Sequence, residues 1–204
     1  MSGSPAPTPP IPLEERYRSL LGISKVLGAI RDPEELIAAL ARELRRLVSF
    51  DFLSLYLGDV LESGPSWNVW RVDERAAVRL PEAFPLEETV EAWVAANQRP
   101  VSWPAPEEQP RFPAFEEAAE RHGIRCLHAL PLVTSSRPIG AMTFASRQPD
   151  AYAGEETAFL SIVADQVALA IDEAASFERL RVAHERLARS GEQLRLVLEV
   201  GQSV

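Results

Sequence analysis

The sequence predicts an α+β fold with helices packed on an antiparallel or mixed sheet, mainly because of its last third. Residues 124–133 (IRCLHALPLV) and 138–146 (PIGAMTFAS) are two apolar runs of strand length, separated by a short polar link. A long helical pattern without proline follows from about Glu155. Helical and weaker strand patterns occupy the first two thirds, which places helices against one shared sheet.

The amino-terminal part opens with two predicted helices. Apolar residues recur at helical spacing over residues 20–30. A second helix begins at Asp32-Pro33, since Asp32 can cap the amino terminus and Pro33 fits the first turn. A period of two then predicts a buried strand at 52–57. The remaining predicted elements are strands at 67–72, 76–80 and 101–103, and short helices at 87–97 and 115–121, the last ended by Gly123.

Composition limits the function classes. The net charge of -9 and the pI near 5.0 argue against nucleic-acid binding, which needs a clustered positive surface. One cysteine cannot form an internal disulfide. The sequence also lacks a secretion signal and an apolar run of about 18 residues, so we expect a soluble cytoplasmic protein that does not bind membranes.

Three segments are predicted along the chain. Residues 1–12 hold five prolines and no charge, which is typical of a disordered leader. Residues 13–176 form the globular domain. Residues 177–204 are predicted to form a coiled-coil-like helix and the start of a following domain. A proline-rich loop at 104–113 is either a pocket cover or a plain surface connection.

The last helix carries a heptad pattern whose apolar markers are Leu180, Leu187 and Leu194. Polar residues such as Glu173 weaken it, and Gly191 is a potential break in the helix. The pattern predicts a parallel homodimer of modest stability. For residues 159–171 the apolar stripe is wider than a coiled coil needs, so this half is also expected to pack on the sheet.

Several motifs resemble the GAF domain family. They are Leu130-Pro131-Leu132 after an alternating strand, Ile139-Gly140 entering the next strand, Ser146 at its exit, and Tyr152 before an acidic helix start. The likeness covers about residues 14–176. The opening helices resemble GAF domains of the formate-hydrogenlyase-activator type, which are input modules of sigma-54-dependent transcriptional regulators and sensor kinases. The final LRLVLEVGQSV is similar to the first helix of a second GAF domain, which implies a tandem arrangement.

The resemblance implies a five- or six-stranded antiparallel sheet. It places the amino- and carboxy-terminal helices on one face and a ligand pocket on the other. Family members bind cyclic nucleotides, bilins, haem, iron or small metabolites, and some bind nothing known, so the fold does not name a ligand or cofactor. The cyclic-nucleotide signature of the family is missing, and a sulfoxide-reducing mechanism needs a second thiol that this chain lacks.

Cys126 and His128 are two residues apart, so on a strand they share one face. Thiolate and imidazole are both metal ligands, but two ligands make no complete metal site, and we interpret the pair as packing or pocket lining. Bilin-binding relatives place their cysteine directly before a histidine, whereas Leu127 intervenes here. Iron-binding relatives carry a cysteine at the position of Leu127, one residue from Cys126. A shift of one residue reverses the face of the strand, so that iron site is not expected here.

Further candidates for a ligand pocket are aromatic and basic. Four tryptophans, Trp67, Trp70, Trp93 and Trp103, fall in the region that forms the pocket side of a GAF domain. They suit a flat or apolar ligand, or else fill a core. Arg125 is a possible counter-charge for a carboxylate, as are Arg71 and Arg137.

The function predicted from these features is sensory rather than catalytic, since no nucleophile–base pair and no metal cluster stands out. We expect an input domain that binds a small molecule and signals through a helical dimer. Alternatives are a ligand-free dimerisation scaffold, or the input domain of a histidine kinase or of a cyclic-dinucleotide enzyme.

Overall fold

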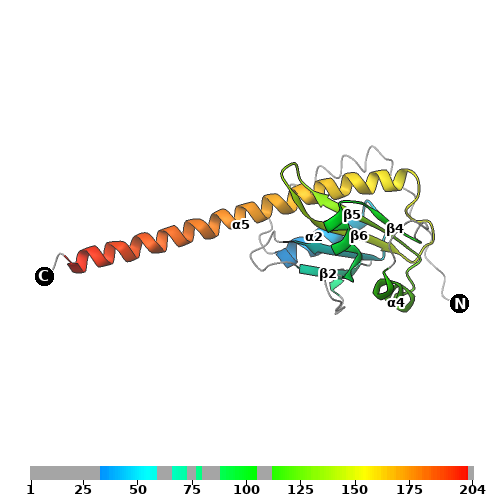
Figure 1. The fold of residues 1–204 in the computed structure, drawn as a ribbon, viewed down its shortest axis with the longest axis horizontal. Coiled ribbons are helices and arrows are strands. Elements are labelled where there is room, and N and C mark those ends of the chain that lie inside the picture. The colour runs from blue at the N-terminus through cyan, green and yellow to red at the C-terminus, as the bar shows by residue number, and fades with distance from the viewer. Residues whose placement is uncertain (1–32, 59–65, 73–76, 80–87, 105–111, 202–204) are drawn as a thin grey trace.

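The structure is a computed structural model that describes residues 33–58, 66–72, 77–79, 88–104 and 112–201 (Figure 1). The described elements are helices and strands. In chain order they are α2 (Pro33–Arg45), β1 (Phe52–Leu57), β2 (Ser66–Val72), β3 (Ala77–Arg79), α3 (Val90–Asn97), β4 (Val101–Trp103), α4 (Pro113–His122), β5 (Cys126–Val133), β6 (Pro138–Ser146) and α5 (Glu155–Gly201).

The strands form one six-stranded sheet in the order β3-β2-β1-β6-β5-β4, and every pair is antiparallel. The centre joins the two ends of the fold, because β1 pairs with β6. Short strands of three residues, β3 and β4, form the two edges of this sheet. The predicted α+β class with an antiparallel sheet is therefore confirmed.

One face of the sheet packs against α2 and α5. Leucines of β1 and β5 meet Met142 and Phe144 of β6 there, and α5 contributes a buried row that runs from Phe159 to Ala175. Burying large apolar side chains of this kind stabilises a fold by about 1.5–3 kcal/mol each. The expectation that the first half of the last helix packs on the sheet is confirmed.

The opposite face packs against α3 and α4, and several of its strand residues are small. Its strands present Ala129, Ala141 and Ala145, and α3 covers them with Val90 and Val94. Alternation along β6 explains the difference, since Ala141 and Ala145 point away from Met142 and Phe144. The strand β6 thus presents bulky residues to the layer of α2 and α5 and small residues to the layer of α3 and α4.

Some boundaries and one helix differ from the sequence prediction. The α3 helix is preceded by Thr89, whose Oγ1 accepts a hydrogen bond from Ala92 N at 3.1 Å, and α4 begins at Pro113, two residues earlier than predicted. A break at Gly191 is wrong: α5 continues to Gly201, because one glycine costs a helix only about 1 kcal/mol. The predicted leader (1–12), the first helix (20–30) and most of the proline-rich loop lie outside the described residues.

Gly140 sits where β6 passes closest to β1. A Cβ atom on this residue would lie 2.0 Å from the backbone oxygen of Tyr56. We expect Gly140→Ala to force the two central strands apart and to lower the free energy of unfolding by about 3 kcal/mol, measured by urea denaturation. Gly58→Ala is the matched control, because a Cβ atom there would lie 3.6 Å from its nearest neighbour, the backbone oxygen of Ile139. Equal stability of the two variants would contradict this account of the strand contact.

Candidate functional site

A buried polar cluster lies between the sheet and α3. Ser54 of β1 and Thr143 of β6 are directly opposite each other in the strand ladder and so share a face. Glu91 comes from the first turn of α3, and the Ser54 hydroxyl donates a hydrogen bond to its Oε1. All three are buried, with exposed fractions of 7%, 2% and 5% for Ser54, Thr143 and Glu91. Polar groups in such a layer are costly unless they are hydrogen-bonded.

Thr143 is the exception within this cluster. Among the residues that the structure describes, its Oγ1 atom has no hydrogen-bond partner. A buried hydroxyl left unpaired costs a fold about 1–3 kcal/mol. Any group that reached Thr143 and hydrogen-bonded to it would recover part of that free energy, which makes the cluster a plausible anchor for a polar ligand atom.

Aromatic pairs flank the same layer. Trp93 of α3 meets Phe112 with ring centroids 6.3 Å apart, and Trp103 of β4 meets Phe115 of α4 at 5.8 Å. Both pairs are edge-to-face, a favourable geometry for aromatic rings. Trp93 and Trp103 are half-buried against the apolar residues between the sheet, α3 and α4, which we call the α3 layer. Two of the four predicted tryptophans therefore come together on this side of the sheet.

The other predicted residues are elsewhere. Cys126 and His128 alternate with Leu127 and Ala129, so they lie on the α5 face of the sheet, away from Trp93 and Trp103. Arg125 is exposed.

Trp67 and Trp70 lie on β2. They pair in the ladder with Tyr56 and Leu53, respectively, and because they are three residues apart they occupy positions on opposite faces of the sheet. Their side chains are outside the described part of the structure.

His128 and Cys126 are both buried, and each has a hydrogen-bond partner. His128 Nδ1 lies 2.9 Å from Ser102 Oγ of β4, and burial lowers the pKa of His128 to about 4. Cys126 Sγ donates to the Gln148 carbonyl oxygen at 3.1 Å, and burial raises the pKa of this thiol. A protonated thiol is a poor nucleophile and a poor metal ligand. Over the described residues, no group of three or more His, Cys, Asp or Glu side chains could hold a metal ion.

Ala175 is the last buried residue of α5 among those whose side chains the structure describes, and beyond it the helix projects away from the rest of the fold (Figure 1). Leu180 and Leu187 are 71% and 74% exposed there, and Ile162 and Leu169 are partly exposed on the same heptad stripe. The third predicted marker, Leu194, lies in the helix, but its side chain is outside the described part. None of the described helices is long and apolar enough to cross a membrane.

The polar cluster is the part of the site that the sequence analysis missed. Ser54 and Thr143 interrupt otherwise apolar strand faces, because each lies two residues from, and on the same face as, an apolar residue, Phe52 and Ala145 respectively. A polar residue inside a doubly buried strand is unusual enough to mark a site. Glu91 carries no comparable mark, because an acidic residue in a first helical turn is ordinary.

The chain belongs to the GAF domain family, whose model matches residues 32–171. A GAF domain is generally a regulatory domain. A comparison with curated proteins gives no match.

Solved structures of GAF domains share the fold at low sequence identity. The GAF domain of a phosphoenolpyruvate-protein phosphotransferase from Coxiella burnetii is 16% identical, with a TM-score of 0.58, and the match covers 83% of this chain and 99% of that one. The GAF domain of a two-component sensor histidine kinase from Bacillus halodurans is 15% identical, with a TM-score of 0.52 and coverage of 73% and 99%.

An enzyme has the same fold. Free methionine-R-sulfoxide reductase from Neisseria meningitidis is 18% identical, with a TM-score of 0.52 and coverage of 79% and 90%. At these identities the likeness shows the fold alone. The fold therefore hosts both sensing and catalysis, and the function of this chain must come from its own residues.

The buried His128 makes stability depend on pH. Its pKa is 6.5 in the unfolded chain and about 4 in the fold, so the unfolded chain binds the proton more readily. The free energy of unfolding is expected to be highest above pH 6.5 and to fall by about 3 kcal/mol as the pH drops to 4. Urea denaturation between pH 4 and 7 measures this.

His128→Gln should remove that part of the pH dependence. His184→Gln, which replaces an exposed histidine of α5, is the matched control. An unchanged pH profile in His128→Gln would show that other groups govern the acid sensitivity.

Proposed function

We propose that this chain is the sensory input domain of a bacterial cytoplasmic signalling protein, most simply a transcriptional regulator. A small molecule binds on the α3 side of the sheet, and α5 carries the response to an output domain. The observation that carries the proposal is that the two faces of the sheet differ. One face holds a buried polar cluster with an unpaired hydroxyl, and the other packs on a helix that leaves the fold.

The ligand is proposed to contact Thr143 and the aromatic side chains of the α3 layer. Thr143 offers a hydroxyl that can donate or accept a hydrogen bond, and Glu91 offers a carboxylate acceptor. Trp93 and Trp103 supply apolar surface nearby. These groups suit a small, partly flat molecule that carries both a hydrogen-bonding edge and an apolar face.

The proposed output is a parallel homodimer formed by α5. Leu180 and Leu187 are seven residues apart and highly exposed, which is unfavourable in a monomer and favourable in a coiled coil. A ligand shifts such a dimer only if it binds two helix packings with different affinity. In this proposal residues 177–204 connect the sensor to a following domain.

A ligand-free scaffold is the second candidate, favoured by the edge-to-face pairs of Trp93 and Trp103, which resemble core packing. In that case the α3 layer only supports the fold and α5 only dimerises. Input to a histidine kinase or a cyclic-dinucleotide enzyme requires the same ligand and helix, and differs only in the output domain.

Native mass spectrometry of the purified chain tests the sensor proposal. We expect a co-purified small molecule, and a melting temperature that rises when that molecule is added back, as mass action requires. Thr143→Val should weaken its binding about tenfold, because one hydrogen bond to the ligand is lost. Thr157→Val, at the start of α5, is the matched control. An empty protein whose melting temperature no metabolite raises would contradict ligand sensing and favour the scaffold.

A further inference from the structure

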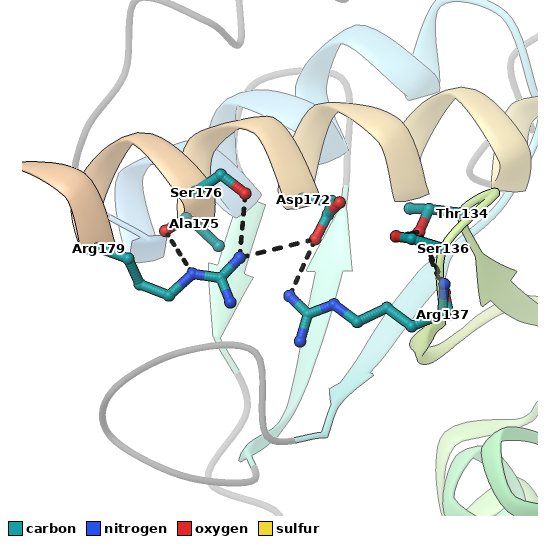
Figure 2. A network of polar contacts seen from close by, with 7 residues as sticks. All are labelled: Thr134, Ser136, Arg137, Asp172, Ala175, Ser176 and Arg179. Atoms are coloured by element: carbon teal, nitrogen blue, oxygen red, sulfur yellow. Dashed lines mark hydrogen bonds and ion pairs between the residues drawn. The ribbon is translucent and has the colours of Figure 1, made fainter.

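One carboxylate on α5 faces two arginines from different parts of the fold (Figure 2). Arg137 Nη2 donates a hydrogen bond to Asp172 Oδ1 at 2.9 Å. Arg179 Nη2 lies 4.0 Å from the same oxygen. Both guanidinium groups approach the same carboxylate oxygen, but only Arg137 is within hydrogen-bonding distance of it.

In this contact Arg137 comes from the sheet side of the fold. It ends the link between β5 and β6, where the Thr134 amide donates to the Arg137 carbonyl oxygen at 2.9 Å. The Thr134 hydroxyl also donates to that oxygen, at 3.1 Å, and lies 3.0 Å from Ser136 Oγ. These bonds fix the backbone of the hairpin, so its position follows that of the two strands.

Arg179 comes from the projecting part of the helix α5. It lies about one helical turn beyond Ala175, which is buried. Its Nε donates to the Ala175 carbonyl oxygen at 3.3 Å and its Nη2 donates to Ser176 Oγ at 3.0 Å. Arg179 therefore has hydrogen-bond partners on its own helix while Arg137 is bonded to Asp172.

We propose that Asp172 exchanges between Arg137 and Arg179, and that this exchange couples the β5–β6 hairpin to the projecting part of α5. The proposal rests on the proposed function, to which it adds the route of the response. Thr143 lies on β6, so a ligand that shifts this strand also shifts the hairpin that carries Arg137.

The contacts have the strength that a switch needs. The side chains of Arg137, Asp172 and Arg179 are 33%, 22% and 45% exposed, so solvent screens each ion pair. A weak ion pair can change partner within the folded state, whereas a fully buried pair would lock the hairpin to the helix. The exchange gives both ends two defined arrangements, which a coupling route requires.

Amide hydrogen exchange at Thr134 in the ligand-free chain tests the proposal, since this amide closes the hairpin. Arg137→Gln should speed exchange about two- to fivefold, because the hairpin loses Asp172. Arg179→Gln should slow exchange by a similar factor, because Arg137 no longer has a competitor. Arg121→Gln, which removes an exposed arginine of an ion pair on α4, is the matched control and should change nothing.

The opposite signs are the decisive outcome, and Asp172→Asn should abolish both effects. A static ion pair predicts instead that Arg179→Gln leaves Thr134 unchanged or speeds its exchange, and either result would overturn the proposal. Persistence of both effects in the Asp172→Asn background would overturn it as well. The readout needs neither ligand nor dimer, so an empty protein in native mass spectrometry would refute the sensor function without affecting this test.

Discussion

The three central strands, β1, β6 and β5, are buried on both faces, and the rest of the structure depends on this constraint. Alternation along a strand then assigns every side chain to one of two layers. Large residues such as Phe144 pack against α2 and α5, and small ones such as Ala141 lie under α3. At Gly140 the backbone of β6 lies so close to that of β1 that a Cβ atom would not fit between the two strands.

This division explains what the sequence could predict. The strands of the last third were recognisable because both faces are apolar, and the long helix because it lacks proline. The start of α4 was predicted two residues late, although Pro113 is a local signal for the first turn of a helix. The assignment of Trp93 and Trp103 to one layer needed the pairing of β4 with β5, which only the three-dimensional structure provides.

The site was harder to predict because it joins residues that are far apart in the chain. Ser54, Glu91 and Thr143 come from three elements, and no local spacing links them. Cys126 and His128 were conspicuous as rare residue types, yet strand alternation places them on the α5 face. Rare residue types thus drew attention to the α5 face, whereas polar residues at buried strand positions mark the candidate site on the α3 face.

The proposed response combines these parts in one direction, from the α3 layer through β6 and its hairpin to α5. It requires the projecting helix to meet a second copy in parallel and in register. Disulfide crosslinking tests this most directly, in a Cys126→Ser background that removes the only native thiol. Leu187→Cys, on the heptad stripe, should crosslink rapidly to its counterpart, whereas Arg189→Cys, two residues further along the helix, should not. Crosslinking that is absent at position 187, or equally slow at both positions, would contradict the account.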